Sequence, residues 1–176
     1  MDKKIKISSV ESPDLTLYSI RSSDLDRLRI WKNEHREVFF HKEIISYSDQ
    51  EKWFRDYLSR PNDFMFTIFV REIPIGCMGF RYIDKVIDVY NVILGNTQMG
   101  KKSYMSQALQ IMCSYARQYY TCEQTARVLI TNPAILWYKK NNFNIKTVYN
   151  DHYILELDEN NFKFKIINEV VEEANL

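Results

Sequence analysis

The most informative segment of the chain reads Asn132-Pro133-Ala134-Ile135-Leu136-Trp137-Tyr138-Lys139-Lys140-Asn141-Asn142-Phe143. It follows an apolar run, residues 126–130, of the kind that forms a buried strand. Asn132 is a good helix N-cap and Pro133 a good first helical residue, while Asn141 and Asn142 suit a helix C-terminus. The segment therefore predicts a strand that leads at once into a short helix, residues 133–141.

Hydrophobic patterning extends this unit into an α/β fold. Alternating apolar residues predict strands, and apolar residues at helical spacing predict helices. The predicted strands are 15–20, 64–70, 75–82, 86–94, 126–130, 145–149 and 152–157, and the other predicted helices begin near 22, begin near 48 and span 104–119. Three antiparallel strands, a crossover helix and a strand parallel to the third give a mixed sheet. We expect residues 36–47 to form a loop or broken helix, and 169–176 a frayed end or a short surface helix.

Length and composition predict one domain, residues 1–176, with its core at about 14–157 and a tail at about 158–176. The formal net charge is +1 and no basic stripe occurs, which argues against nucleic acid as a partner. The three cysteines and three histidines show no metal-ligand spacing, so no metal is expected. The N-terminus lacks the apolar core of a signal peptide, and no apolar run is long enough for a membrane span. We therefore expect a soluble cytoplasmic protein with reduced cysteines and no membrane partner.

The opening segment resembles the second acyl-CoA motif of the GNAT N-acetyltransferases. In that motif an Asn at a strand-to-helix junction precedes an Ala, a Tyr and a Gly-Phe pair; here these are Asn132, Ala134, Tyr138 and Phe143. Asn142 stands where the family has Gly, and Asn tolerates the left-handed conformation better than most residues. The resemblance implies the GNAT fold, with a mixed sheet that splays between the strands 86–94 and 126–130 and binds acyl-CoA in the gap. That fold allows a homodimer built through the C-terminal strands.

A second resemblance to this family lies between strand 86–94 and helix 104–119. The start of a helix is an anion site, because its first N–H groups are unpaired and its dipole favours negative charge. Gly100-Lys101-Lys102-Ser103-Tyr104-Met105 resembles the family's diphosphate loop, although Met105 is bulkier than the small residue expected there. Ser103 can replace a loop glycine if its φ is negative. The alternative is a plain solvated loop with two exposed lysines.

The resemblance assigns a set of residues to the acyl donor, acetyl-CoA. Val92, Ile93 and Leu94 would pair with the pantetheine arm through their backbone, and the Asn132 side-chain amide would hold its other side. The complete expected set is Val92, Ile93, Leu94, Gly100, Lys101, Lys102, Ser103, Tyr104, Met105, Asn132, Ala134 and Tyr138.

Acetyl transfer to an amine needs a proton donor and a proton acceptor. Tyr138 matches the family position whose hydroxyl lies near the thioester sulfur and protonates the departing thiolate. A half-buried packing role is the alternative for a Tyr on a short amphipathic helix. Asp88, on the central strand, is the first candidate for the general base, and Glu43 and His41 are the others.

The N-terminal third resembles one branch of the family. Leu28-Arg29-Ile30-Trp31-Lys32-Asn33, Ile45-Ser46 and Gln50-Glu51-Lys52-Trp53-Phe54 are similar to enzymes that acetylate amino groups on nucleotide-linked sugars. That branch borders enzymes that acetylate protein N-termini, including ribosomal ones. The acceptor-site candidates are Arg29, Trp31, Asn33, His41 and Tyr90, with Arg29 meeting a phosphate or carboxylate and Trp31 or Tyr90 stacking on a ring.

A structural role is the alternative for two of these candidates. Trp31 would then be a core residue, and Arg29 would pair with Asp26 or Glu34 on the same helix. The sequence as a whole predicts an acetyl-CoA-dependent N-acetyltransferase that acts on a primary amine, in the first place an amino sugar on a nucleotide. The other readings are a protein N-terminal acetyltransferase and a non-catalytic GNAT-like domain that binds acyl-CoA.

Overall fold

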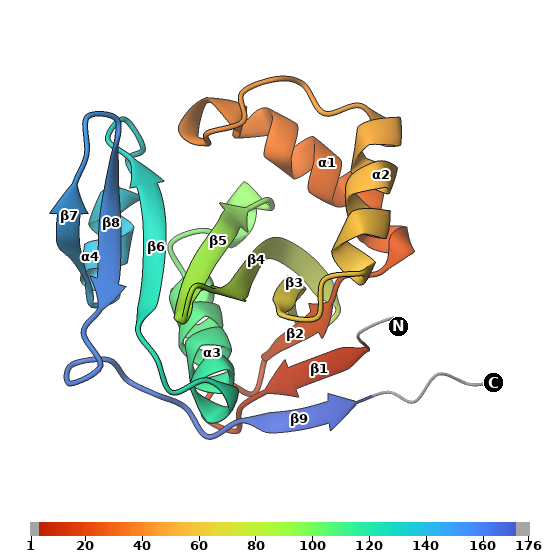
Figure 1. Cartoon of the computed structure of the whole chain (residues 1–176). Helices are drawn as coiled ribbons and strands as arrows, with labels where there is room; N and C mark the ends of the chain where they lie inside the picture. The colour runs from red at the N-terminus through yellow and green to blue at the C-terminus, as the bar shows by residue number, and fades with distance from the viewer. Residues whose placement is uncertain (1–3, 172–176) are drawn as a thin grey trace.

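A computed structural model describes residues 4–171 and shows one mixed sheet with helices on both faces (Figure 1). In chain order the strands and helices are β1 (Ile5–Ser8), β2 (Leu15–Ser19), α1 (Leu25–Glu34), α2 (Tyr47–Leu58), β3 (Asp63–Val70), β4 (Ile73–Ile83), β5 (Val86–Leu94), α3 (Tyr104–Tyr119), β6 (Gln124–Leu129), α4 (Ile135–Lys140), β7 (Phe143–Val148), β8 (His152–Leu157) and β9 (Asn168–Val171). Short 3-10 turns lie at Ser22–Asp24, Arg36–Val38 and Thr97–Met99. Within residues 4–171 no helix is long and apolar enough to cross a membrane.

The sheet has nine strands in the order β7-β8-β6-β5-β4-β3-β2-β1-β9. Its neighbours are antiparallel except for β5 and β6, which are parallel and joined by the crossover helix α3. Parallel pairing requires such a crossover, because the chain must return to the same end of the sheet. The predicted mixed α/β sheet is therefore confirmed.

The sheet splits where its direction changes. β5 and β6 pair only from Ile87 to Val89 on one strand and from Gln124 to Ala126 on the other. Beyond that point β5 runs on to Leu94 and β6 to Leu129 without pairing with each other, so a gap opens between their ends. A bulge in β5 increases the divergence: Asn91 has a φ of 50°, and the register with β4 shifts beside it.

Alternation along the strands fills two separate cores, one on each face of the sheet. On one face, Phe66, Ile68, Met78 and Phe80 pack with the buried side of α3. On the other face, Met65, Cys77 and Ile93 pack with side chains from α1 and α2. Successive side chains of a strand point to opposite faces, which is why adjacent residues such as Cys77 and Met78 belong to different cores.

The two ends of the chain differ from the expected arrangement. β1 was not anticipated, and part of the predicted tail, Asn168–Val171, is strand β9 rather than a frayed end or helix. β9 pairs with β1 over Ile5 to Ser8, and Glu169 accepts hydrogen bonds from Tyr115 and Tyr119 on α3. The rest of that predicted tail, 172–176, lies outside the described residues.

Two helix starts also differ. α2 begins at Tyr47, because Ser46 caps it and forms a capping box with Asp49. α4 begins at Ile135, two residues after the expected start, although the Asn132 side chain does accept the Ala134 N–H at 2.9 Å.

Candidate active site

A cavity of about 490 Å³ lies on the α1–α2 face of the sheet, beside the split. We call it the first cavity; its walls come from α1, α2, the loop after α1, β4, β5, β6 and the start of α4. Its lining includes Lys32, Phe39, His41, Trp53, Arg81, Asp88, Tyr90, Asn91, Val92, Arg127, Asn132, Ala134 and Tyr138. The volume is that of a small-molecule site.

A second cavity, of about 860 Å³, lies on the other side of the split, between the end of β5, the start of α3 and α4. Its lining includes Val92, Leu94, Gly100, Lys101, Ser103, Tyr104, Met105, Ala134, Trp137, Lys140 and Lys163. Val92 and Ala134 line both cavities, so the two meet at the gap between β5 and β6. Two molecules held in these cavities would touch at that gap.

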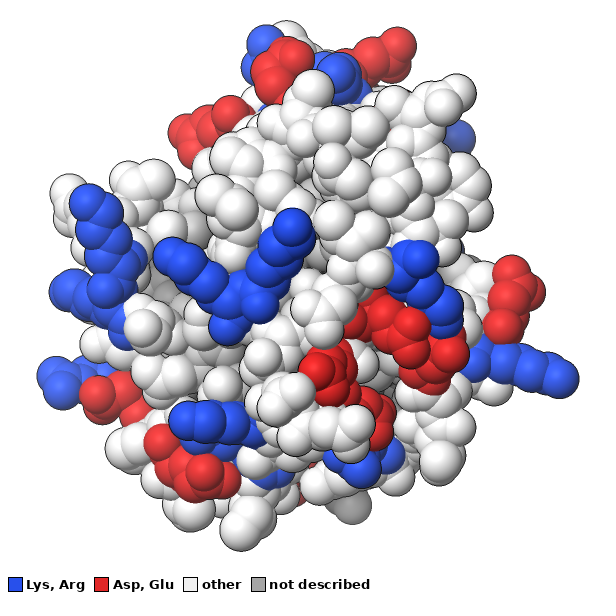
Figure 2. Space-filling view, turned by 90° about the vertical axis from the view of Figure 1, so that its left-hand side faces the viewer, with Lys and Arg blue, Asp and Glu red and all other residues white. Residues whose placement is uncertain are grey.

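Three lysines and no carboxylate are among the described residues that line the second cavity. They come from three segments of the chain: Lys101 before α3, Lys140 at the end of α4, and Lys163 after β8. Figure 2 views the side of the molecule that carries α4, β7 and β8, and shows basic and acidic side chains in small separate groups. The positive lining and the large volume suit a long ligand that carries phosphate groups.

The start of α3 adds open backbone donors to this cavity. Its N-cap, Ser103, makes no side-chain capping bond, so the N–H groups of the first turn are available to an anion. The condition set for Ser103 to replace a loop glycine, a negative φ, is not met, because Ser103 has a φ of 58° and Lys101 one of 60°. The backbone of both residues is therefore left-handed, a conformation that costs energy for residues other than glycine. Asn142, at 63°, has the left-handed conformation expected of it.

Most of the expected acyl-donor residues line the second cavity, but Ile93, Asn132 and Tyr138 line only the first. Lys102 is not among the described residues that line either cavity. Met105 lines the second cavity and also packs against the core on the α3 face, with its sulfur 3.2 Å from the place a Gly76 side chain would occupy. The bulky residue at a normally small position is therefore accommodated by contacts with β4.

Tyr138 lies one helical turn after Ala134, which lines both cavities. Its ring is buried on α4, in edge contact with Trp137 and Phe143, and it lines the first cavity. No other described residue hydrogen-bonds its hydroxyl. Burial raises the pKa of Tyr138 well above its ordinary value, with Cys113 and Asp88 adding to the effect. The hydroxyl is thus neutral at pH 7 and can donate a proton or a hydrogen bond.

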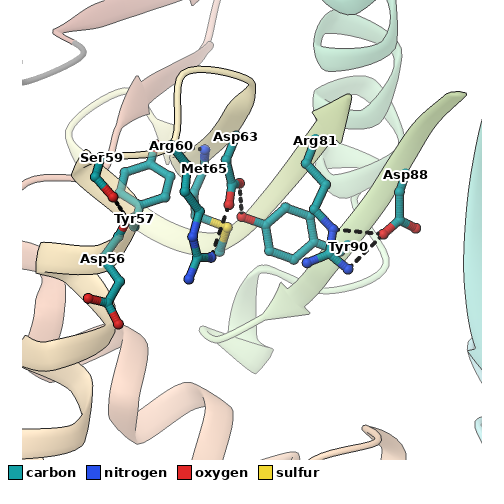
Figure 3. Close-up of polar contacts among 9 residues, drawn as sticks. All are labelled: Asp56, Tyr57, Ser59, Arg60, Asp63, Met65, Arg81, Asp88 and Tyr90. Carbon is teal, nitrogen blue, oxygen red and sulfur yellow. Dashed lines mark hydrogen bonds and ion pairs between the residues drawn. The ribbon is translucent and has the colours of Figure 1, made fainter. Parts of the chain in front are cut away.

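Asp88 lies in a chain of polar contacts along one wall of the first cavity (Figure 3). Its Oδ2 accepts bonds from both Nε and Nη2 of Arg81 at 2.9 Å, while no described residue donates to its Oδ1. The Arg81 guanidinium also lies over the Tyr90 ring, 4.9 Å from its centroid. The pair leaves one carboxylate oxygen open to the cavity or to water.

The Tyr90 hydroxyl is directed away from this pair and donates to Asp63, which is buried at the start of β3 (Figure 3). Burial raises the pKa of Tyr90, and the Asp63 carboxylate raises it further. Only the ring of Tyr90 is then offered to a ligand, as expected for a stacking residue.

Of the remaining expected acceptor residues, three have structural contacts and do not line the cavity. Arg29 pairs with Asp26 at 2.7 Å, and Trp31 is 8% exposed, with its indole against the backbone of Gly95. The side-chain amide of Asn33 donates to the Ile45 carbonyl and accepts from the Ile45 N–H. These are the structural alternatives for Arg29 and Trp31.

The two residues of the loop after α1 lie nearer to ligand space. His41 lines the first cavity, while Glu43 lines a smaller hollow of about 340 Å³ next to it. Asp88 is therefore better placed as a proton acceptor than Glu43.

Asn132 connects this loop to α4. Its amide donates to the Val38 carbonyl at 3.2 Å, and its oxygen accepts from Ala134. One amide N–H remains for a ligand, so Asn132 positions the cavity wall as well as facing it.

Lys32 was not anticipated as a site residue. Its ammonium donates to the Asn91 side chain at 2.6 Å and lies 3.2 Å from the centre of the Phe39 ring, inside the first cavity. Burial lowers the pKa of Lys32 to about 8, and the nearby Cys77 partly offsets this effect. The only sequence signal for Lys32 was its place within the segment 28–33, between the expected acceptor-site residues Trp31 and Asn33.

No cluster of three or more His, Cys, Asp and Glu residues suited to a metal occurs within residues 4–171.

Comparison with known proteins gives one family. Residues 14–143 match the family described as "Acetyltransferase (GNAT) domain". No curated protein sequence matches the chain significantly.

Solved structures give the same fold at low sequence identity. A domain from Methanocaldococcus jannaschii DSM 2661 aligns with a TM-score of 0.70 and 19% identity, over 89% of this chain and 99% of that one. Spermidine N-acetyltransferase from Vibrio cholerae, in complex with CoA and spermine, aligns with a TM-score of 0.70 and 16% identity, over 82% and 95%. FdhC, described as a nucleotide-linked sugar GNAT, aligns with a TM-score of 0.69 and 12% identity, over 89% and 90%.

Proposed function

The chain belongs to the GNAT acetyltransferase family, and on that premise we propose that it moves an acetyl group from acetyl-CoA to the amine of a nucleotide-linked amino sugar. The single observation that carries this proposal is the meeting of two cavities at Val92 and Ala134, one helical turn before Tyr138 in the wall of the first cavity. One cavity suits a phosphate-bearing donor and the other a small acceptor. Their junction is where transfer would occur.

The second cavity would hold acetyl-CoA, the donor substrate. Lys101, Lys140 and Lys163 supply positive charge, and the first turn of α3 supplies unpaired N–H groups. The ends of β5 and β6 do not pair with each other, so the edge of β5 that faces the gap leaves backbone groups for the pantetheine arm at Val92 to Leu94. The donor supplies the activated acetyl group; the chain supplies position and proton transfer.

Two side chains would then handle protons. Asp88, through its open oxygen and directly or through water, takes a proton from the acceptor ammonium, so that the nitrogen lone pair can attack. As the new C–N bond forms and the C–S bond breaks, the Tyr138 hydroxyl donates to the departing sulfur. Pairing with Arg81 keeps Asp88 in place, whereas burial keeps Tyr138 protonated until that step.

Aromatic rings and positive charge in the first cavity support a nucleotide-linked acceptor. Tyr90, Trp53 and Phe39 present ring surface of the kind that stacks on sugars and bases. Its volume of about 490 Å³ fits a small molecule better than an extended peptide, which favours the amino sugar over a protein N-terminus. The fold shared with a nucleotide-linked sugar GNAT agrees with this choice.

The cysteines support a cellular compartment for the protein, and the sheet edges support an oligomeric state. Cys77, Cys113 and Cys122 are free thiols, which agrees with a reducing compartment such as the cytoplasm. The sheet ends at β7 and β9, whose outer edges could pair with a second copy to form a homodimer.

Mass spectrometry of acetyl transfer tests the proposal. Purified enzyme and acetyl-CoA would be offered a UDP-linked amino sugar, the same sugar as a methyl glycoside, spermidine, and peptides with free N-termini. We expect the UDP-linked amine to be acetylated with the highest kcat/KM. A preference for spermidine or a peptide would contradict the acceptor assignment. Failure to acetylate any amine, with CoA bound, would contradict the enzymatic assignment.

A further inference from the structure

Lys32 is a cation with no carboxylate partner in the wall of the first cavity. Of the described residues, Asn91 accepts its hydrogen bond and Phe39 lies beneath its ammonium, and both are neutral. Asn91 belongs to the β5 bulge, so its left-handed backbone turns the amide toward α1 across 59 residues of sequence. The surroundings orient the ammonium without neutralising it.

Cys77 and the two described carboxylates that line the first cavity, Asp88 and Asp49, leave the charge of Lys32 in place. From β4, Cys77 is a neutral thiol, because burial raises its pKa to about 12. On β5, Asp88 forms an ion pair with Arg81, which compensates its negative charge. From α2, Asp49 is held by the backbone and hydroxyl of Ser46 in the capping box.

Apart from these groups, Arg127 is the charged side chain in the described part of the lining. Arg127, on β6, lines the cavity and lies 5.8 Å from the centre of the Phe40 ring. His41, from the loop after α1, lines it as well. After the Arg81–Asp88 pair cancels, the described lining therefore presents Lys32 and Arg127 as cations, with Asp49 at the edge of α2 as the acid.

A partly buried lone ammonium is costly, because the cavity replaces only part of its water shell. A ligand anion placed beside it removes this cost and forms a charge-assisted hydrogen bond. A polyamine would instead bring further positive charge to the same wall, which is unfavourable. The cavity therefore distinguishes acceptors by the sign of their charge.

We propose that Lys32 is the specificity residue of the acceptor site, where its ammonium binds a phosphate or carboxylate group carried by the acceptor and so selects anionic amines over polyamines. This inference rests on the proposed function only in that the first cavity receives the acceptor. It does not depend on which sugar or base the acceptor carries.

Binding of simple anions tests the inference without turnover. The protein is first saturated with CoA, so that phosphate groups cannot enter the second cavity. Pyrophosphate, UDP and malonate are then titrated in, and the ammonium of Lys32 is followed by NMR of labelled lysine. We expect at least one of these anions to bind and to raise the pKa of Lys32, because an opposite charge favours the charged form.

The three anions also identify the group. A response to pyrophosphate and UDP alone assigns a phosphate, and a response to malonate alone assigns a carboxylate. If none of the three raises the pKa of Lys32, the inference is overturned, whatever the acetyl-transfer assay shows.

Variants separate recognition from folding and from catalysis. Lys32→Met keeps the side-chain length over Phe39 but removes the charge, and we expect anion binding to weaken about 10- to 100-fold. Lys139→Met is the control, because Lys139 is exposed on α4 and is not among the lining residues of either cavity. Lys32→Arg retains the charge and should recover part of the binding.

Turnover provides the last distinction. With Lys32→Met, KM for the UDP-linked amine should rise about 10- to 100-fold, while the uncharged methyl glycoside changes less than about 3-fold. An equal fall of kcat for both acceptors would make Lys32 a proton-transfer or structural residue and overturn the inference. If wild-type protein acetylates neither amine yet binds the anion through Lys32, the proposed function fails and this inference stands.

Discussion

The Tyr138 side chain is buried and neutral in the wall of the first cavity, and no other described residue hydrogen-bonds its hydroxyl. The hydroxyl is therefore available to a ligand in that cavity. The raised pKa also means that deprotonation of Tyr138 cannot limit the rate below about pH 10. These properties suit a proton donor to sulfur better than a packing residue.

Replacing Tyr138 with Phe removes the donor and keeps the ring contacts with Trp137 and Phe143. We expect kcat to fall about 10²-fold, the size of a typical general-acid contribution. The Kd for CoA, from calorimetry, should change less than about 3-fold. Tyr153→Phe on β8 is a control outside both cavities and should leave both values unchanged. Equal losses of turnover and CoA affinity would show that Tyr138 is structural.

The lowered pKa of Lys32 predicts how the free energy of unfolding changes with pH. Its folded-state pKa is about 8, below the ordinary 10.5, so the unfolded chain binds more protons between these values. The stability of the wild type attributable to this group therefore rises as pH increases from about 8 to about 10.5. Below pH 8 the folded protein bears the cost of the buried charge.

Lys32→Met removes that cost, and we expect the free energy of unfolding of the variant to exceed that of the wild type by about 1–2 kcal/mol at pH 7. This range is smaller than the full pKa shift implies, because water in the cavity screens the charge. The difference should shrink toward zero between pH 8 and pH 10.5. Urea unfolding of both proteins at several pH values gives it directly, because the Tyr and Cys titrations cancel in the comparison. A constant difference across this range would mean that the ammonium is solvated in the folded state.

At the scale of elements, the loop before α3 has backbone strain at two residues. Lys101 and Ser103 are both left-handed, and such a conformation costs roughly 1–2 kcal/mol for a residue other than glycine. Strain of this kind persists where surrounding structure or a ligand fixes the loop.

Ser103→Gly should relieve part of the strain. We expect a gain of about 0.5 kcal/mol in unfolding free energy, since glycine gives back some of the benefit as entropy in the unfolded chain. Lys102→Gly is a matched control next to it, because Lys102 does not have a positive φ, and it should lose about 0.5–1 kcal/mol. Chemical denaturation measures both changes. A loss of stability in Ser103→Gly would show that the Ser103 side chain has a structural role.

Elements with local signals were predicted well from the sequence. β5 (Val86–Leu94) and α3 (Tyr104–Tyr119) match the expected boundaries, because Gly95 ends the strand and the helix has a clear apolar face. β1 and β9 were missed because each has four residues, and their pairing with each other depends on contacts far along the chain. A short edge strand has no periodicity of its own to detect.

The site was predicted in part for the same reason. The positions of Tyr138 and Ser103 follow from local motifs next to predicted helix starts. The Lys32–Asn91 contact could not be predicted, because it depends on a bulge in β5 that turns Asn91 toward α1. The packing of Trp31 likewise depends on a distant residue. Gly95 lacks a side chain, and a Cβ there would lie 2.0 Å from the indole, so α1 can pack directly on the end of β5.

At the scale of the whole molecule, the proposed function divides two tasks between the two sides of the split sheet. The second cavity, proposed for the donor, is built from α3, α4 and the residues after β8, and the first cavity, proposed for the acceptor, from α1, α2 and the loop between them. β5 belongs to both and joins the two cores. Variants on one side should therefore leave binding on the other side unchanged.

Thermal unfolding with CoA tests this division. CoA at about 100 times its Kd should stabilise the fold by about 2.7 kcal/mol, which raises Tm by roughly 5–10 °C for a chain of this size. The combined variant Lys101→Met, Lys140→Met and Lys163→Met should lose most of this shift, because all three lysines line the second cavity. Lys32→Met should keep it. A wild-type Tm that does not respond to CoA would contradict the donor site, whereas loss of the shift in Lys32→Met would mean that the two cavities are coupled through β5.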